Sequence, residues 1–525
     1  MGVLIGLDVG TTNTKAVAFD PETGHVVAVA SHPTPYVSAG TGADAREIDP
    51  DALWAGAVDC LRQVISAAAR PVLAVGIASM AEAGVPLDAT GKALYRIIPW
   101  YDARTEPQAR RVMSHPDSDH LFKVTGQAPR HVYTLYKILW LRDHEPRVID
   151  RLHRWLSIAD FVGWKLTDAA ATDFSLASRT MLLDQRSRQW SPELLELAGL
   201  RAAQLPALTR SGATIGSVTA DAARETGLSV GLPVGIGGHD HLCGALAAGA
   251  VRPGQVVDSI GTAEGLVIPS AAYRDDDLFL RSRICCYAHV LPDQFVIQAG
   301  MAMSGGGLTW IANQLFADAA DPVAAALDAA GRAPAGADRL LYLPYLGGNG
   351  SPIGDENVAA AFVGLRPAQE RGHLVRAVLE GIAFGIRHTL EVAAGAVGGI
   401  GEPIRVVGGG GRSALWLQIR ADVLGRTMLA VELPEAVALG AALLAGVGAG
   451  VYPDAVSAAA SVDRHTKPYH PDPSRAGFYA KRYREGYLPL YPALAPIFGA
   501  LEHRSSIPKS PKFGLGRSES SGPIG

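Results

Sequence analysis

The most constraining feature of this chain is the stretch LIGLDVGTTNTKAVAFD at residues 4–20. Two apolar segments, each of a length typical of a buried strand, flank a loop of glycine and small polar residues. One carboxylate, Asp8, lies before the loop, and one cation, Lys15, lies after it. The pattern predicts a β-hairpin whose turn carries polar groups although its strands are buried.

The residues of this loop favour an anion-binding turn. Gly10 permits a tight turn and lets a ligand approach the backbone amides closely. Successive amides in such a turn, supplemented by hydroxyl groups and a lysine, form a concavity for phosphate oxygens. Asp8 is suited to hydrated Mg²⁺, which takes one or two carboxylates and keeps several waters. An ordinary hairpin is the alternative, since Gly, Asn and Thr are common in turns. The predicted phosphate-binding residues are Gly10, Thr11, Thr12, Asn13 and Lys15.

Composition excludes several classes of protein. A chain of 525 residues that is 48% hydrophobic can bury large cores in roughly two to four domains. A net charge of −4 gives no electrostatic case for binding nucleic acid, whose binders usually show a basic face. Four Cys without CxxC spacing argue against a disulfide scaffold or a structural zinc site. The uncharged run at 436–452 is too short to span a membrane and favours a buried helix. We therefore expect a cytoplasmic protein without nucleic-acid or membrane partners; a homodimer is left open.

The chain has the organisation of an α/β protein. Apolar, β-rich runs alternate with amphipathic stretches, and residues 373–397 predict one long helix. The segment VVDSIGTAEGLVI at residues 256–268 repeats the pattern of the opening hairpin. We expect two related lobes, at residues 1–245 and 246–495, and a disordered Ser-, Pro- and Gly-rich tail at 503–525.

Three glycine-rich segments follow the opening hairpin in order. They are GIGGHDHLCGALAAG at 235–249, DSIGTAEG at 258–265 and VVGGGGRSALWLQIRADVLGRTM at 406–428. This order and spacing resemble the FGGY carbohydrate kinases of the actin-like, sugar kinase and Hsp70 ATPase superfamily. PWYDAR at 99–104 and RAVLEGIAFGIR at 376–387 add to the resemblance, which runs from about residue 2 to about residue 490.

The resemblance implies two actin-like (ribonuclease H-like) lobes with a cleft between them that binds ATP and Mg²⁺. The first loop would clamp the ATP phosphates, Gly261 and Thr262 would form a second clamp, and Asp8 with Asp240 would hold the metal. Asp240 would also be the general base, since an ordinary Asp is ionised at neutral pH and can accept a hydroxyl proton. The residues implied to line the adenosine pocket are Gly409, Gly410, Gly411 and Ser413.

Two further pairs of residues invite other chemistry. His239 and His241 flank Asp240, but an isolated His-x-His without further spaced ligands is weak support for a metal site. Cys285 and Cys286 are expected to be ordinary buried residues rather than a redox pair.

The acceptor site departs from both subgroups that this chain resembles. In GIASMAEAGVPLD, Glu82 stands where xylulokinases carry a His; it matches the Glu of the glycerol kinase Arg-Glu pair, whereas Ala81 replaces the Arg. Glu82 is therefore a candidate ligand of acceptor hydroxyls, and its charge would disfavour an anionic acceptor such as an aldonate unless nearby Arg104 offsets it. Core packing is the alternative role for Trp100. The residues expected to bind the acceptor are Glu82, Trp100, Asp102, Arg104, Asp240 and His241.

These patterns together predict a carbohydrate kinase of sugar catabolism. It would transfer a phosphoryl group from Mg²⁺-bound ATP to a hydroxyl of a small ketose or polyol, by positioning the reactants and neutralising charge. An actin- or Hsp70-like ATPase that works by conformational change is one alternative. A catalytically inactive sugar sensor is another.

Overall fold

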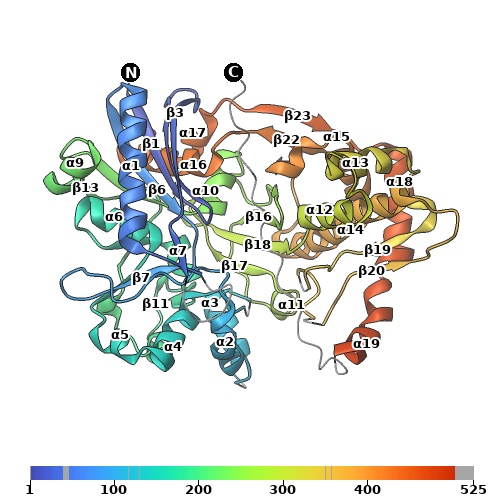
Figure 1. Ribbon diagram of the computed structural model, residues 1–525, viewed down its shortest axis with the longest axis horizontal. Coiled ribbons are helices and arrows are strands. Elements are labelled where there is room, and N and C mark those ends of the chain that lie inside the picture. The colour runs from blue at the N-terminus through green and yellow to red at the C-terminus, as the bar shows by residue number, and fades with distance from the viewer. Residues whose placement is uncertain are drawn as a thin grey trace.

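The computed structural model describes residues 2–38, 46–115, 117–128, 130–348, 350–355 and 357–502. Within these ranges the chain forms two large β-sheets with helices around them, side by side in Figure 1. The α/β class predicted from the sequence is thus confirmed. The predicted tail at 503–525 lies outside the described residues. In the described part of the chain, no helix has both the length and the apolar content that crossing a bilayer requires.

The first sheet contains the opening hairpin. Its spatial order is β13 (Thr214–Ser217), β14 (Pro233–His239), β6 (Val72–Ser79), β1 (Val3–Val9), β2 (Asn13–Phe19) and β3 (Val26–Pro33). Strands β1, β2 and β3 pair antiparallel, whereas β6 pairs parallel with both β1 and β14. Nearly every residue of β1 and β6 is buried, as expected for central strands covered on both faces.

The second sheet repeats this arrangement. Its order is β17 (Cys285–Ala288), β18 (Phe295–Met301), β16 (Glu264–Ser270), β15 (Val257–Ile260), β21 (Ile404–Val407), β22 (Met428–Glu432) and β23 (His465–Tyr469). Strands β15, β16 and β18 form the antiparallel part, and β21 pairs parallel with β15 and β22. The hairpin β15–β16 therefore occupies the same place in its sheet as β1–β2, which accounts for the repeated sequence pattern.

Helices surround both sheets, and short two-stranded ribbons accompany both lobes. The helices up to residue 247 are α1 (Pro50–Ala68), α2 (Glu106–Met113), α3 (Ser118–Thr125), α4 (Thr134–His144), α5 (Pro146–Arg151), α6 (Ile158–Thr167), α7 (Phe174–Arg179), α8 (Pro192–Ala198), α9 (Ala220–Thr226) and α10 (Asp240–Ala247). Those that follow are α11 (Asp277–Arg281), α12 (Gly305–Leu315), α13 (Pro322–Arg332), α14 (Arg371–Val397), α15 (Ala414–Leu424), α16 (Ala436–Gly448), α17 (Ala455–Ala460), α18 (Pro473–Arg482) and α19 (Leu490–Glu502). The ribbons are β4 (Tyr36–Ser38) with β5 (Arg46–Ile48), β7 (Gly84–Leu87) with β8 (Arg154–Ser157), β9 (Ala171–Asp173) with β12 (Ala207–Thr209), β10 (Leu183–Asp184) with β11 (Gln189–Trp190), and β19 (Leu341–Leu343) with β20 (Ala361–Val363).

Helix α16 connects the two halves of the molecule. It follows the last parallel strand of the second sheet, yet it packs on β1, β6 and β14 of the first sheet and against α10. A Cβ on Gly6 would lie 1.8 Å from the carbonyl oxygen of Ala438, and a Cβ on Gly440 would lie 2.0 Å from that of Cys243. Glycine at these two positions therefore permits the close contact. The boundary expected at residue 245 would assign α16 to the second lobe, but α16 packs on the sheet of the first lobe.

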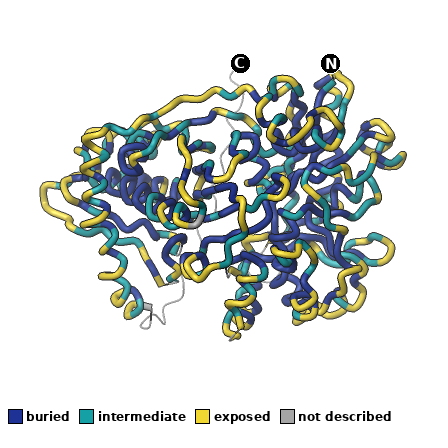
Figure 2. The backbone as a smooth tube through the Cα atoms, turned by 180° about the vertical axis from the view of Figure 1, so that it is seen from behind, coloured by how far each residue is buried: buried dark blue, intermediate teal, exposed yellow. Residues whose placement is uncertain are grey.

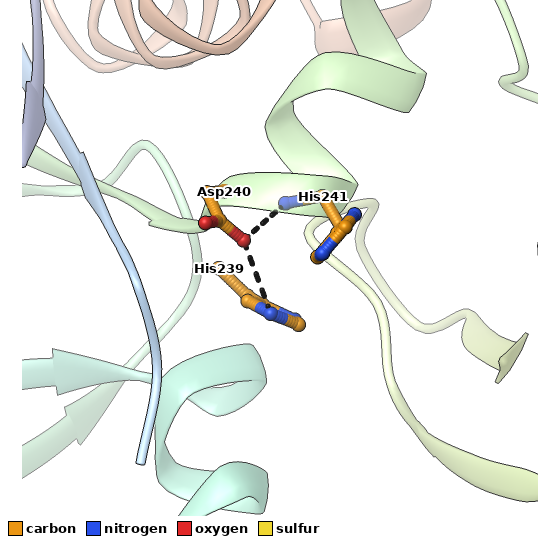
Figure 3. Close-up of side chains that lie close together, drawn as sticks. All are labelled: His239, Asp240 and His241. Atoms are coloured by element: carbon orange, nitrogen blue, oxygen red, sulfur yellow. Dashed lines mark hydrogen bonds and ion pairs between the residues drawn. The ribbon is translucent and has the colours of Figure 1, made fainter. Parts of the chain in front are cut away.

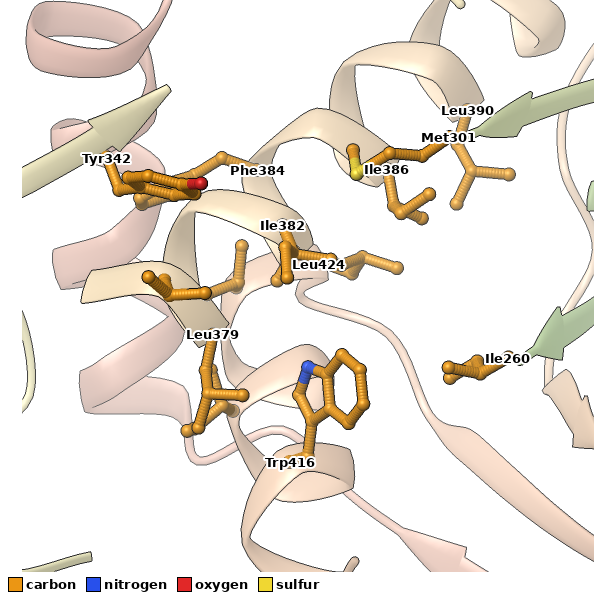
Figure 4. Packing of buried hydrophobic residues seen from close by; sticks show 14 of the residues in the cluster. Ile260, Met301, Tyr342, Leu379, Ile382, Phe384, Ile386, Leu390, Trp416 and Leu424 are labelled. Atoms are coloured by element: carbon orange, nitrogen blue, oxygen red, sulfur yellow. The ribbon is translucent and has the colours of Figure 1, made fainter. Parts of the chain in front are cut away.

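The largest apolar core lies in the second lobe, where α14 packs against α13, α15 and β19. The predicted helix at 373–397 is confirmed: α14 spans Arg371–Val397 and ends at Gly398, which has a left-handed φ of 74°. Figure 4 shows Ile382 and Phe384 of α14 with Trp416 of α15 in this core. Buried backbone runs through both lobes in Figure 2, and the exposed segments lie mainly at the periphery. The two sheets and their cores thus support the loops that lie between them.

Candidate active site

The turn between β1 and β2 is held in place by hydrogen bonds that its carbonyl oxygens accept from neighbouring residues. The Thr34 hydroxyl donates to the Gly10 carbonyl at 2.9 Å, and the Tyr36 hydroxyl donates to that of Thr11 at 2.8 Å. The Thr34 amide donates to the Thr12 carbonyl at 3.0 Å. In a trans peptide the N–H points opposite to the C=O, so the amides that follow these carbonyls face the other way. This geometry suits an anion-binding turn.

The two charges beside this turn lie on paired strands. Asp8 and Lys15 are opposite each other in the β1–β2 ladder, and Lys15 Nζ lies 2.9 Å from the carboxylate of Glu435 at the start of α16. Burial, and next the neighbouring carboxylate of Asp240, raise the pKa of Asp8 to about 8. Part of the positive charge of Lys15 is balanced by Glu435, a partner that the sequence did not reveal.

Two cavities meet at Asp240. The first has a volume of about 370 Å³, and Glu82, Trp100 and Arg179 are among the residues that line it. The second has a volume of about 890 Å³ and is lined by Asp8, Lys15 and the glycine-rich turn after β21, among others. The side chains of Asp240 and His241 border both cavities. A group bound in one cavity would thus lie next to a group bound in the other.

Asp240 begins helix α10, directly after β14 ends. Its Oδ1 accepts a hydrogen bond from the His241 amide at 2.6 Å and lies 3.2 Å from Nε2 of His239 (Figure 3). Burial raises the pKa of Asp240, and the charge of His241 and the hydrogen bond from its amide oppose that rise. Burial, and next the charge of Arg179, hold the pKa of His239 well below its ordinary value, so this imidazole is neutral.

The second predicted phosphate turn, Gly261–Ala263, joins β15 to β16. The amides of Gly305 and Gly306, in the first turn of α12, donate to the carbonyls of Gly261 and Thr262 at 3.1 and 3.0 Å. A Cβ on Gly305 would lie only 2.4 Å from the Gly261 carbonyl oxygen, so the contact requires glycine there. Gly261 lines the first cavity.

A buried ion network lies beneath this turn. The Arg420 guanidinium, from α15, donates to Asp258 at 2.9 Å and to Glu264 at 2.7 Å, and all three side chains are fully buried. The hydroxyl of Ser304 also donates to Glu264. Because Asp258 and Glu264 lie on the strands that lead into and out of the turn, the network fixes its position. Sequence reasoning missed this network.

The glycine-rich turn at residues 408–411 lies only partly on the second cavity. Gly409 and Gly411, two of the residues predicted to line an adenosine pocket, line this cavity. Gly410 instead faces the core, where its Cβ would lie 2.3 Å from Cγ2 of Ile260. Ser413 caps α15, and its hydroxyl accepts a hydrogen bond from the Trp416 amide. The structure therefore gives Gly410 and Ser413 positions that support the turn.

The predicted acceptor residues divide into two groups. Glu82 and Trp100 line the first cavity, and the indole Nε1 of Trp100 donates to the Thr11 hydroxyl at 3.0 Å. Asp102 and Arg104 bond to each other, and Arg104 also donates to Glu47 at 2.6 Å. Neither of these two is among the described residues that line the two cavities, so they fix the segment that follows Trp100.

Glu82 has a partner that the sequence analysis did not identify. Nε of Arg179 donates to the Glu82 carboxylate at 2.7 Å, and Nη2 donates to the same oxygen. The guanidinium also lies over the rings of Tyr133 and Tyr287, at 5.0 and 5.3 Å. Arg179 is the one charge in the run FSLASRTMLL at residues 174–183, a signal that could have singled it out. Because Arg179 balances Glu82, the expected repulsion of anionic acceptors loses its basis.

All four cysteines are buried and free, and the burial expected for Cys285 and Cys286 is confirmed. Cys285 lies close to the first cavity, where its thiol accepts a hydrogen bond from the amide of Ala128 at 3.4 Å.

Comparison with known proteins identifies the family. Residues 3–247 match the N-terminal domain of the FGGY family of carbohydrate kinases, and residues 259–449 match its C-terminal domain. The chain is 29% identical over 479 residues to the xylulose kinase of Bacillus subtilis (strain 168), which covers 90% of this chain and 93% of that protein. It is 30% identical over 472 residues to the L-fuculokinase of Salmonella typhi, with 89% and 97% covered.

The structural comparison agrees with the sequence match. The crystal structure of xylulose kinase from Rhodospirillum rubrum has a TM-score of 0.88 and 31% identity, and the match covers 95% of this chain and all of that one. The predicted two-lobed, actin-like fold and the prediction of a phosphotransferase that uses ATP are confirmed. The two alternatives, a purely conformational ATPase and an inactive sensor, are not supported. The chain belongs to the FGGY family of carbohydrate kinases.

Proposed function

We propose that this kinase transfers the γ-phosphoryl group of ATP to a hydroxyl of a small ketose or polyol, with Asp240 as the general base. The observation that carries the proposal is that Asp240 borders both cavities. Phosphoryl transfer requires donor and acceptor to lie in line and adjacent, and a carboxylate at their junction can take the hydroxyl proton.

The second cavity is the proposed nucleotide site. Its volume of about 890 Å³ and its border of Gly409 and Gly411 suit an adenosine with backbone contacts. Lys15 lies at the same cavity, close to the turn that is proposed to bind the phosphates together with the Gly261–Ala263 turn. Oriented amides and a cation stabilise the negative charge of the transferred group.

The donor set of the second cavity fits Mg²⁺. Asp8 and Asp240 both line this cavity, and the charge of Asp240 is among the causes that raise the pKa of Asp8. Two carboxylates that repel each other are stabilised by a divalent cation, and Mg²⁺ prefers such oxygen ligands. When bound, Mg²⁺ would neutralise phosphate charge. The chain's own part is to hold the two carboxylates at the end of β1 and the start of α10.

The first cavity is the proposed acceptor site. Glu82, Gln298 and His241 supply hydrogen-bonding groups along its border, and Trp100 supplies an aromatic face. These groups suit several neighbouring hydroxyls, as in a ketose or polyol. We also place the protein in the cytoplasm, where ATP is available; its four free thiols are consistent with a reducing compartment.

An ADP-release assay coupled to NADH oxidation tests the proposal. Purified protein with Mg²⁺ and ATP is screened against pentuloses, hexuloses, polyols and aldonates. We expect acceptor-dependent ADP release with a ketose or polyol, and a phosphorylated product by mass spectrometry. An aldonate as the best acceptor would contradict the proposed substrate class.

A further inference from the structure

Three potential ligand side chains converge at the junction of the two cavities. His239, Asp240 and His241 each offer one ligand atom, and these atoms all lie within 4.8 Å of one another. The two imidazole rings meet edge to face with centroids 5.4 Å apart, and Figure 3 shows them close to the Asp240 carboxylate. Consecutive residues achieve this because β14 ends and α10 begins between His239 and Asp240.

Hydrogen bonds determine which nitrogen of His239 carries the proton. The Tyr287 hydroxyl donates to Oε1 of Gln298 at 2.8 Å, so its oxygen is left to accept a hydrogen bond. Nδ1 of His239 lies 3.1 Å from that oxygen and therefore donates to it. The Nε2 atom of a neutral ring then carries a lone pair. A hydrogen bond of this kind on the far nitrogen is the usual support of a metal-bound histidine.

The Nε2 atom of His239 lies close to a second electron-rich atom. Nε2 lies 3.2 Å from Oδ1 of Asp240, and both atoms are acceptors when Asp240 is ionised. Two acceptors at this distance repel each other unless a cation lies between them. The imidazole of His241 adds a third ligand, and because this residue is exposed its ring can rotate toward the other two.

We propose that His239, Asp240 and His241 bind a borderline-soft divalent cation of the zinc class, and that its binding inhibits the kinase. Two imidazoles and one carboxylate are a typical ligand set for Zn²⁺ with one open position, whereas Mg²⁺ prefers oxygen ligands. The inhibition rests on the proposed function: His239, Asp240 and His241 all line the first cavity, so Zn²⁺ bound to them would occupy the place where the acceptor hydroxyl approaches Asp240.

Binding is tested directly with Co²⁺ as a spectroscopic substitute for Zn²⁺. The full-length protein, freed of metal, is titrated with CoCl₂ in the absence of nucleotide, and its visible absorption is recorded. We expect the absorption to saturate at one equivalent of Co²⁺ and to disappear when Zn²⁺ is added. H239Q and H241N should bind Co²⁺ at least 10-fold more weakly, because loss of even a residue that only supports a metal ligand weakens metal affinity by that factor. H120N is the matched control, because His120 is exposed and 3.0 Å from Glu193, far from this cluster in the sequence.

Circular dichroism and thermal melting establish that each variant is folded before titration. If wild-type protein gives no saturable absorption, or if H241N and H120N bind Co²⁺ equally well, the metal site is refuted. These measurements use no substrate, so they hold even if the proposed function fails.

Inhibition is tested with the best acceptor at saturating MgATP and with free Zn²⁺ fixed by a zinc buffer. We expect reversible inhibition that is competitive with the acceptor. The Zn²⁺ concentration that halves the uninhibited rate of H241N should be at least 10-fold higher than the concentration that halves the rate of the wild type. If the wild-type protein binds Co²⁺ but keeps its activity when Zn²⁺ occupies the site to the same extent, the inhibitory role is refuted. Absence of activity with every acceptor would instead contradict the proposed function.

Discussion

Replacement of Arg179 by methionine tests how the first cavity is built. The substitution keeps the length of the side chain but leaves the Glu82 carboxylate, which is 7% exposed, without its cation. Removing one partner of a buried ion pair costs about 3–5 kcal/mol. The hydrogen bond from Arg179 to Gln127, 2.8 Å long, is lost as well. We therefore expect Arg179→Met to lower the free energy of unfolding by about 3–5 kcal/mol.

The pair also affects binding, because Arg179 fixes the carboxylate that is proposed to accept hydrogen bonds from the acceptor. We expect kcat/KM for the acceptor to fall about 10-fold or more, which corresponds to one lost charged hydrogen bond, with little change in the KM for ATP. In the double variant with Glu82→Gln, the effects on stability should fall short of their sum by up to about 3 kcal/mol.

Urea unfolding and the ADP-release assay measure these effects. Fluorescence and circular dichroism must give the same midpoint for each variant, since the free energies assume a two-state transition. Arg188→Met is the matched control: Arg188 also lies over two rings, those of Phe174 and Phe295, but does not border the first cavity. Additive effects of the two substitutions, or equal losses for Arg179→Met and Arg188→Met, would refute the reasoning.

Three further substitutions test other parts of the structure. Gly410→Val should raise the KM for ATP about 10-fold because its side chain would collide with Ile260 and shift the glycine-rich turn; steady-state kinetics in which only the acceptor KM changed would contradict this. Arg420→Met leaves two fully buried carboxylates unpaired and should destabilise the protein by about 3–5 kcal/mol, and an unchanged urea midpoint would argue against the network. Burial lowers the pKa of Lys137 from 10.5 to about 8, so the unfolded chain binds more protons between these values. The free energy of unfolding of the wild type relative to Lys137→Met should therefore rise by about 3 kcal/mol as the pH rises from 8 to 10.5. Urea unfolding at several pH values measures this difference, and a difference that stayed constant with pH would contradict the prediction.

Local sequence patterns predicted the elements of this fold because those elements depend on local periodicity. The apolar runs around residues 4–20 and 256–268 became equivalent hairpins, and the helical spacing at 373–397 became α14. The return of α16 to the first sheet was not predicted. It depends on contacts such as that between Gly6 and Ala438, which lie far apart in the chain and leave no periodic signal.

The same distinction applies to the site. Asp8 and Asp240 could be singled out because Asp8 lies near the end of β1 and Asp240 directly follows β14, each within a recognisable motif, and both line the second cavity. The partners of charged residues could not: Arg179 is 97 residues from Glu82. Arginine is rarely fully buried without a partner, so an isolated Arg in an apolar run is the signal to search for one.

The most direct test of the central claim is the turnover of Asp240→Asn. Asparagine keeps the size of the side chain but cannot accept the proton, so kcat should fall about 10²-fold or more. Calorimetry should show that ATP still binds. If the variant phosphorylates the acceptor at a rate near that of the wild type, Asp240 is not the base and the proposed mechanism is wrong.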